Sequence, residues 1–291
     1  MAIVTRRPET DEVKEPEARP VRSKRSRRPR LGLHALLVIS CLVLCAPIVY
    51  ALLVSTQNNA QMVNFQLFPG DSFADNFDTV WNQRNLGAYM INSAIMSIII
   101  AAGKTITGLL AGLAFVYFRF PGRWIVFFFV LITLMMPTEI SILALLDLVY
   151  DFGWSGTMAS LTIPFLASAT AAFLFRQHFA NLPSNLAEAA QLDGANPIQF
   201  LVKVLIPLSW NVIGALAVIE FLYGWNMYLW PLLSGNDTVV QVGLSSLQQA
   251  GQGQLYGPLM MGAVIASIPP ILVFLVLQRP FMKGFAMAQD K

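Results

Sequence analysis

Charged side chains are scarce in this chain. Asp, Glu, Lys and Arg together make up 12% of its 291 residues, hydrophobic residues make up 56%, and the mean hydropathy is +0.59. Soluble domains carry about 25% charged residues, so this composition does not supply the polar surface that a water-soluble protein needs. The scarcity of charge excludes an ordinary soluble domain and indicates that lipid surrounds most of the chain.

The basic residues that are present lie mostly at one end. Ten of the 19 Lys and Arg residues fall in residues 1–30, and nine are spread over the rest. The net charge of +3 therefore describes a tail, and the lack of a basic patch on any folded segment excludes nucleic-acid binding. Residues 1–30 are rich in Arg, Glu and Pro without an apolar stripe, which predicts a disordered cytosolic tail whose second half faces anionic lipid headgroups.

Cysteine and histidine are also rare. Cys41 and Cys45 lie four residues apart in an apolar run, and we interpret them as small apolar residues on one helix face. Neither His34 nor His178 is accompanied by a cluster of acids or cysteines in the sequence. These patterns predict no disulfide framework, no metal site, no cofactor and no catalytic residue.

The sequence contains several long apolar runs. Six runs approach or exceed the roughly 20 residues that cross a bilayer. They cover 33–54, 87–115, 124–149, 158–175, 210–231 and 258–277. The first run has a long basic region before it and no small-residue cleavage site after it, so it predicts a retained anchor rather than a signal peptide. The sequence therefore predicts an all-α integral membrane protein with six transmembrane helices.

Lys and Arg residues between the runs predict the orientation. With the first residues in the cytosol, the inner segments hold 17 basic residues, the outer segments hold Arg84 alone, and Lys104 lies within a run. The positive-inside rule then places both termini in the cytosol. The expected organisation is a tail at 1–30, a first transmembrane helix at 31–54, an extracytoplasmic loop at 55–86, a core of five transmembrane helices at 87–280 and a tail at 281–291.

The inner loop 179–208 predicts a short helix, a tight turn and a second helix at the cytosolic surface. Three alanines make 185–192 a strong helix former, Gly194 permits a left-handed turn that ends it, and Asn196–Pro197 begins the second helix. Pro207 marks the start of the fifth run. The alanines are expected to give the first helix a narrow, smooth face that a groove in another protein accepts.

This loop resembles a known family motif. Glu188-Ala189-Ala190, three further residues, Gly194, nine more and then Val204-Leu205-Ile206-Pro207 are similar to the EAA loop of binding-protein-dependent ABC importer permeases. Val204 and Ile206 stand where the family has Ile and Leu, and both remain aliphatic. The alternative is an ordinary amphipathic surface loop.

The resemblance implies a type I ABC importer permease fold in which this loop forms coupling helices that dock into a cleft of an ATPase subunit. The residues that would carry the coupling are Glu188, Ala189, Ala190, Asp193, Gly194 and Pro207.

Further stretches resemble particular branches of this family. Phe118–Pro121 and Pro137–Glu139 fit its carbohydrate-importer, maltose-permease-like branch, and Tyr223–Leu232 is similar to the second permease subunit of sn-glycerol-3-phosphate importers. The resemblance implies a non-catalytic, multi-pass subunit of the bacterial inner membrane, in contact with membrane lipid. Its expected partners are a second permease subunit, two ATP-binding ATPase subunits and an extracytoplasmic solute-binding protein. The implied solute is sn-glycerol 3-phosphate or a glycerophosphodiester.

Ionisable residues at membrane depth are the first candidates for a solute pathway. They are Lys104, Glu139 and Glu220, and the alternative for each is a buried structural contact. Pro137 near Glu139 predicts a kinked helix with a freed carbonyl. Gly103-Lys104-Thr105 lacks the preceding glycine of a phosphate-binding loop, because Ile98 stands there, so ATP is expected to bind to a partner.

An aromatic group near the end of the fifth run supplies the remaining candidates, which are Trp225, Asn226, Tyr228 and Trp230. They form either a belt at the lipid interface or the lining of an outward cavity. Asn226 favours the cavity, because an amide gains nothing from contact with lipid.

The charged residues within the apolar runs do not by themselves indicate a dianionic solute. Lys104 is the one cation there, whereas Glu139 and Glu220 are anions and Asp147 lies near the outer end. Three explanations stay open: the partner permease supplies cations, the pore binds its solute weakly, or the solute carries balancing positive charge. In the last case Glu139 and the tryptophans would attract a choline group. A di- or oligosaccharide is the alternative solute.

Two other classes of function compete with an importer subunit. An ion-coupled secondary transporter would show inverted repeats with interrupted spans in matching positions, and a membrane-embedded enzyme would carry a catalytic cluster. The sequence shows neither.

Overall fold

A computed structural model describes residues 31–236, 238–249 and 255–286. The predicted tail at 1–30 and the end of the tail at 281–291 lie outside this part. The chain divides into two compact units, residues 1–46 and 47–291, and each is considered by itself. The described residues form helices and no strand, in agreement with the expected all-α class. Helix α1 (Leu31–Val54) begins in the first unit and ends in the second.

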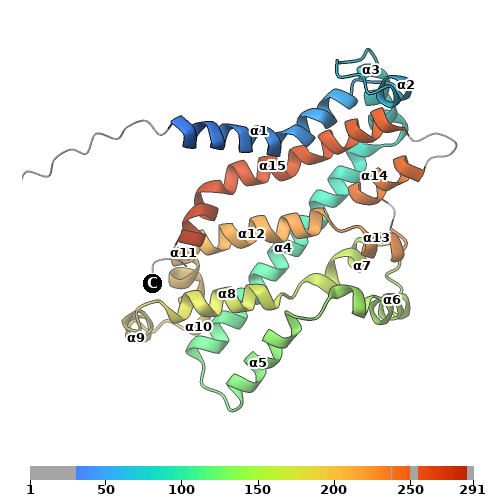
Figure 1. The fold of residues 1–291 in the computed structure, drawn as a ribbon. Coiled ribbons are helices and arrows are strands. Elements are labelled where there is room, and N and C mark those ends of the chain that lie inside the picture. The colour runs from blue at the N-terminus through green and yellow to red at the C-terminus, as the bar shows by residue number, and fades with distance from the viewer. Residues whose placement is uncertain (1–30, 237, 250–254, 287–291) are drawn as a thin grey trace, which may run out of the picture. The chain divides into compact units, whose positions relative to one another are not determined.

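Figure 1 shows the remaining helices, all of which belong to the second unit. In chain order they are α2 (Asn59–Val63), α3 (Phe73–Asp78), the π-helix η1 (Thr79–Gln83), α4 (Leu86–Tyr117), α5 (Arg123–Thr133), the short 3-10 helix η2 (Thr138–Ser141), α6 (Ile142–Asp151), α7 (Met158–Thr162), the 3-10 helix η3 (Ile163–Phe165), α8 (Ala169–Ala180), α9 (Asn185–Leu192), α10 (Pro197–Phe200), the π-helix η4 (Leu201–Leu205), α11 (Ile206–Leu208), α12 (Trp210–Trp225), α13 (Leu229–Leu233), α14 (Val240–Gln249) and α15 (Tyr256–Ala286).

Three helices are each long and apolar enough to cross a membrane, namely α1, α4 and α15. Two bent pairs qualify together: Met158–Phe165 with Ala169–Ala180, bent by 42°, and Pro197–Leu208 with Trp210–Trp225, bent by 81°. By length and composition the described helices therefore offer up to five spans. The expected count of six is not reached, because the third apolar run does not form one helix.

The third run, 124–149, is interrupted near Pro137. Helix α5 ends at Thr133, η2 begins at Thr138, and α6 follows from Ile142. Proline has no backbone N–H and its ring clashes with the preceding turn, so a helix cannot continue through it without distortion. The sequence predicts a kink here, and the structure has a complete break between two short helices.

Four helices make up the centre of the second unit, in the spatial order α15, α12, α4 and α8 (Figure 1). Glycines allow the close approach of α4 and α8: a Cβ added at Gly108 would lie 2.6 Å from the Cβ of Ala171, and one added at Gly112 would lie 2.8 Å from the Cβ of Phe175. Small residues with this spacing are typical of helix contacts in lipid. Gly108 and Gly112 therefore serve the packing of α4 against α8.

The loop at 55–86 is folded rather than irregular. The side-chain amide of Asn76 donates to the carbonyls of Ser55 (2.8 Å) and Gln57 (2.9 Å), and it is buried. The backbone N–H of Tyr256, at the start of α15, donates to Oδ1 of Asn59 (3.1 Å). The first two bonds hold the loop together, and the third joins it to α15 at the end of the unit opposite the inner loop 179–208 (Figure 1).

Candidate functional site

The turn between α9 and α10 is set by local backbone chemistry. Gly194 has φ +73°, the backbone N–H of Ala195 donates to the carbonyl of Ala190 (2.9 Å), and that of Gly194 donates to Gln191 (3.0 Å). This is the Schellman arrangement that satisfies the last carbonyls of a helix. The side chain of Asn196 then caps α10 in a capping box with Gln199. The predicted helix, turn and second helix are all present.

The predicted outward face of alanines is only partly right. Ala187 and Ala190 are half-buried and pack against the hydrophobic cluster at this end of the unit, which contains Leu113, Phe175, Phe179, Phe200 and Leu205. Ala189 is exposed beside Glu188, and Leu192 is 90% exposed. Helix α9 thus packs against the bundle through Ala187 and Ala190. Its exposed residues Glu188, Ala189 and Leu192 are accessible to a partner.

The second half of the loop leads directly into α12. Leu201 and Leu205 are buried in the same cluster, whereas Ile198 and Val202 on the same segment are exposed. Pro207 lies in the first turn of α11, and the chain then bends by 81° before α12 begins at Trp210. Asp193 is exposed at the C-terminal cap of α9. Any displacement of the loop would therefore act on the first turn of α12.

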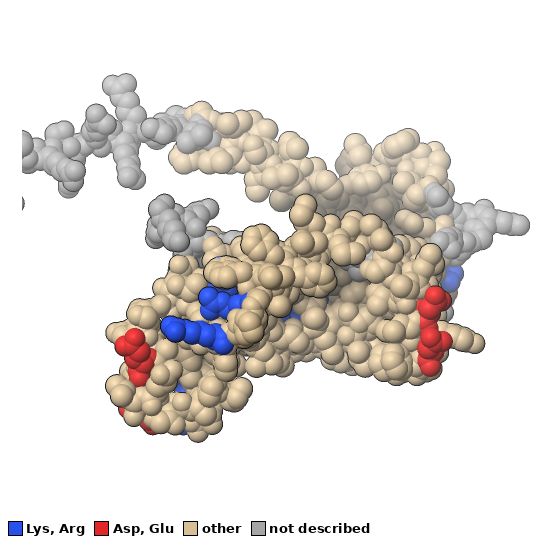
Figure 2. All heavy atoms as spheres, turned by 90° about the horizontal axis from the view of Figure 1, so that it is seen from below, with Lys and Arg blue, Asp and Glu red and all other residues tan. Residues whose placement is uncertain are grey.

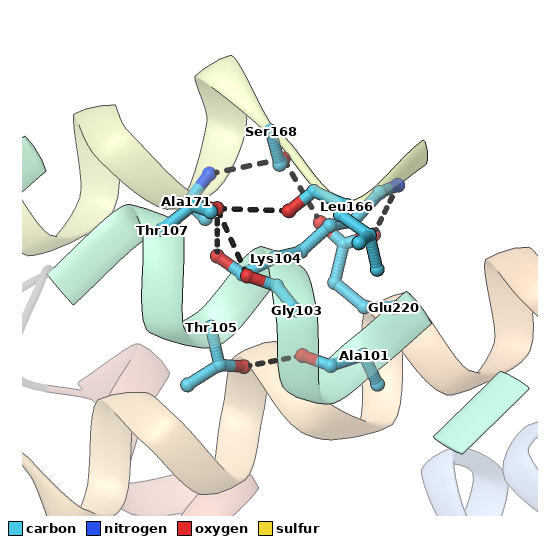
Figure 3. A network of polar contacts seen from close by, with 9 residues as sticks. All are labelled: Ala101, Gly103, Lys104, Thr105, Thr107, Leu166, Ser168, Ala171 and Glu220. Atoms are coloured by element: carbon cyan, nitrogen blue, oxygen red, sulfur yellow. Dashed lines mark hydrogen bonds and ion pairs between the residues drawn. The ribbon is translucent and has the colours of Figure 1, made fainter. Parts of the chain in front are cut away.

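Lys104 of α4 and Glu220 of α12 meet in the middle of the bundle (Figure 3). Lys104 Nζ lies 2.8 Å from Glu220 Oε2, and the two residues are only 7% and 4% exposed. The ammonium group also lies 3.6 Å from the centre of the Tyr223 ring. Within the described residues this is the only ion pair.

The ion pair extends to the break before α8. The Ser168 hydroxyl donates to Glu220 Oε1 (3.1 Å) and accepts from the backbone N–H of Ala171 (3.2 Å), so it also caps α8. The hydroxyl of Thr107 donates to the carbonyl of Leu166 (2.9 Å), which lies in the same break (Figure 3). At the 42° bend, Thr107 of α4 therefore donates to a backbone carbonyl, and Glu220 of α12 accepts from the serine that caps α8.

Burial explains why these groups occur together. An isolated charge in an apolar interior is strongly destabilised, and a partner at hydrogen-bond distance offsets that cost. The sequence predicts that Lys104 and Glu220 line a pathway or make buried contacts, and the structure gives them a contact with each other. A role in a solute pathway remains a prediction for both residues.

A hollow of about 510 Å³ lies at the other end of α12. Its lining includes Tyr223, Asn226, Tyr228 and Trp230. Trp230 is buried, and its Nε1–H donates to the carbonyl of Ser160 (3.0 Å). Three of the four aromatic-group candidates thus share one hollow, as the cavity interpretation expects.

Trp225 does not belong to this hollow. It is 2% exposed and stacks on Phe221, with ring centres 5.8 Å apart. Neither Trp225 nor Trp230 lies on an exposed surface, so a lipid-facing belt does not describe these two tryptophans. The backbone of Glu139 lies in η2, but its side chain is outside the described part of the structure.

Two participants in the polar network are absent from the sequence-predicted set. Tyr223 lies three residues after Glu220, a spacing that puts both on one helix face. Ser168 directly precedes an apolar helical segment, which is the pattern of an N-cap. Both signals were available in the sequence. Among the described residues, no group of three His, Cys, Asp or Glu side chains is arranged to hold a metal.

The ion pair predicts that a second substitution restores part of the stability lost by the first. Lys104→Met leaves a buried carboxylate unpaired, and Glu220→Gln leaves a buried ammonium unpaired, so each should lower the stability by about 3–5 kcal/mol. The double variant Lys104→Met/Glu220→Gln removes both charges and keeps an acceptor for Ser168, so it should unfold at a higher temperature than either single variant. Thermal unfolding of the purified protein measures this, and a double variant whose loss equals the sum of the two single losses would contradict the pairing.

Comparisons with known proteins agree with this geometry. Residues 104–285 match the family model of the binding-protein-dependent transport system inner membrane component. The chain is similar to the sn-glycerol-3-phosphate transport system permease protein UgpE of Brucella melitensis, with 38% identity over 264 residues that cover 86% of this chain and 94% of the relative. It is 37% identical to UgpE of Agrobacterium fabrum over 268 residues, covering 88% and 95%. It is 36% identical to UgpE of Salmonella typhi over 263 residues, covering 86% and 94%.

A solved structure supports the fold. A chain of a bacterial ABC transporter involved in the import of the acidic polysaccharide alginate superposes with a TM-score of 0.72 at 21% identity, covering 86% of this chain and 95% of that chain. The resemblance that the EAA-like loop indicates is confirmed by these matches. The chain therefore belongs to the family of binding-protein-dependent transport system inner membrane components, as an inner-membrane permease subunit of an ABC importer.

Proposed function

We propose that this chain forms half of the translocation pathway of an importer for sn-glycerol 3-phosphate or a related glycerophosphodiester. The chain would pair with a second permease subunit, two ATPase subunits and an extracytoplasmic solute-binding protein. The observation that carries the proposal is the loop at 179–208. A family motif folds there into two helices joined by a left-handed turn, and the outer face of the first helix, at Glu188, Ala189 and Leu192, is unoccupied within the described chain.

The proposed mechanism is alternating access. ATP closes the dimer of ATPase subunits, the coupling loops move with it, and the bundle changes from inward-open to outward-open. The loop is well placed for this, because it packs on α4 and α8 through the cluster around Phe179 and Phe200 and continues through the 81° bend into α12. ATP hydrolysis belongs to the partner subunits in this scheme, and this subunit is non-catalytic.

The solute is proposed from the relatives, which are glycerol-3-phosphate permeases by name. In the described part of this subunit the single buried ammonium, that of Lys104, is already paired with Glu220. A dianionic solute would therefore draw its cations from the partner permease, or the solute would carry positive charge of its own. Weak binding of the solute in the pore is compatible with either source of positive charge.

A di- or oligosaccharide is the second candidate solute. The structural neighbour with a TM-score of 0.72 belongs to an importer of the polysaccharide alginate. The hollow at the end of α12 is lined by Tyr223, Tyr228 and Trp230, whose rings offer apolar faces with polar edges. Such a lining suits a sugar ring as well as a glycerol backbone.

Coupling depends on the left-handed turn at Gly194 in this proposal. No atom lies within 4 Å of a Cβ added there, so a substitution acts through the backbone rather than by collision. Gly194→Val should insert normally and lose most solute-stimulated ATPase activity and transport, because a β-branched residue resists φ +73°. Gly194→Asn is the matched control, since Asn tolerates this conformation, and it should retain both activities.

Glu188→Lys reverses a charge on the exposed face of α9 and should uncouple the importer in the same assay. Reconstituted complexes that keep full transport and ATPase stimulation with both Gly194→Val and Glu188→Lys would show that another segment couples the subunits.

The solute is tested separately with the cognate binding protein and the reconstituted complex. Glycerol 3-phosphate or a glycerophosphodiester should bind and stimulate ATP hydrolysis, and disaccharides such as maltose or trehalose should not. Stimulation by sugars alone would reject the glycerophosphate solute and leave the importer function intact.

A further inference from the structure

Three arginines gather at the loop end of the bundle, where α4 turns into α5. Arg119 and Arg123 line one hollow of about 710 Å³ together with Trp124. The guanidinium of Arg176, from α8, lies 5.0 Å from the centre of the Trp124 ring and 4.7 Å from that of Phe127. Figure 2 shows Lys and Arg side chains at this end of the molecule, with Asp and Glu side chains at its edge.

None of these arginines has a carboxylate partner among the described residues, where the pair of Lys104 and Glu220 is the sole ion pair. Arg123 Nη1 donates to the carbonyl of Phe118 (3.4 Å), and its guanidinium lies 5.4 Å from the Trp124 ring. Arg123 and Arg176 are half-buried and held by aromatic rings. Guanidinium groups presented in this way provide several N–H donors to an anion, and phosphate oxygens are acceptors that match them.

An apolar surface continues from the arginines along α5. Ile125, Phe128, Phe129 and Ile132 follow the spacing of one helix face, and all four are exposed, with Ile125 at 77%. Arg123 lies in the first turn of the same helix, Arg119 lies just before it, and Arg176 of α8 contacts the rings of Trp124 and Phe127 on it. A ligand that covers both features must carry an anion at one end and a long apolar body at the other.

We propose that Arg119, Arg123 and Arg176 bind the phosphate of an anionic phospholipid whose acyl chains lie along the exposed face of α5. The lipid belongs to the leaflet beside the coupling loop. Basic pockets at the ends of membrane helices bind phospholipid headgroups in this way. A nucleotide or free phosphate would leave the face of α5 uncovered, and an acidic protein segment would not extend along it.

The site adjoins the coupling loop. A second hollow of about 610 Å³ is also lined by Arg119 and Arg123, and its other wall includes Ala190, Gln191 and Pro197 of the loop. A phosphate held by these arginines would neutralise charge directly beside α9. Coupling between the loop and the bundle should therefore depend on anionic lipid.

The experiment measures lipid retained by the assembled importer in native mass spectrometry. Complexes are exchanged into mixed micelles of phosphatidylglycerol and phosphatidylcholine with identical acyl chains. The unsubstituted protein should retain phosphatidylglycerol in preference. Arg119→Gln/Arg123→Gln should reduce this retention by about 5-fold for each arginine removed. The control Arg84→Gln/Arg279→Gln removes the same charge elsewhere and should retain the lipid.

Three outcomes would overturn the proposal. Equal retention by the double variant and the unsubstituted protein would show that the arginines do not hold the lipid. Equal retention of the two phospholipids would show that the site does not distinguish an anionic headgroup from one whose phosphate is balanced by choline. Displacement of phosphatidylglycerol by millimolar inorganic phosphate would mean that the acyl chains contribute nothing, so the site would be one for a free anion.

The functional arm uses nanodiscs made with either lipid. ATPase activity of the unsubstituted complex should be higher in phosphatidylglycerol than in phosphatidylcholine, and the Arg119→Gln/Arg123→Gln complex should lose this difference. A lipid difference of unchanged size in that variant would contradict the link to coupling.

Discussion

The buried contact between Lys104 and Glu220 is the interaction on which the centre of the bundle depends. Each side chain would be strongly destabilised alone in an apolar interior, and together they join α4 to α12. Ser168 extends the contact to the beginning of α8, and the Tyr223 ring covers the ammonium group. A rearrangement of these helices must either keep the charges together or exchange each for another partner. The contact therefore favours movement of the three helices as one body.

Helix α12 connects the loop 179–208 to the hollow at the other end of the bundle. It begins after the 81° bend that follows the loop 179–208, carries Glu220 in its second half, and ends at the hollow lined by Asn226, Tyr228 and Trp230. The glycines of α4 allow α8 to pack closely on the other side. A displacement of the loop would thus be transmitted to the hollow by α12, which the buried ion pair joins to α4.

Local features of the loop 179–208 could be predicted from the sequence because they depend on a few neighbouring residues. The bounds of α9, the positive φ of Gly194 and the cap at Asn196 all follow from backbone conformations and hydrogen bonds within one turn. The break at Pro137 has the same local origin. Its extent was not predicted, because a count of apolar residues treats 124–149 as one run.

Features that depend on helix rotation and packing could not be predicted. Depth along a span shows that Lys104 and Glu220 each need a polar partner, but the two residues are 116 positions apart and depth does not show that they face one another. Similarly, the alanines of α9 share one helix, and only packing decides that Ala187 and Ala190 face the bundle while Ala189 faces outward. Trp225 and Trp230 fit a lipid-interface pattern, and the fold buries both.

We propose that the exposed face of α9 meets the ATPase subunit. The most direct measurement places a photocross-linking residue at Leu192, which is 90% exposed, and in a second protein at Phe68, which is 74% exposed in the loop at the opposite end. In the active importer, illumination should join position 192 to the ATPase subunit and should give no such product from position 68. An active importer with no ATPase adduct at position 192, or with equal adducts from both positions, would contradict the account.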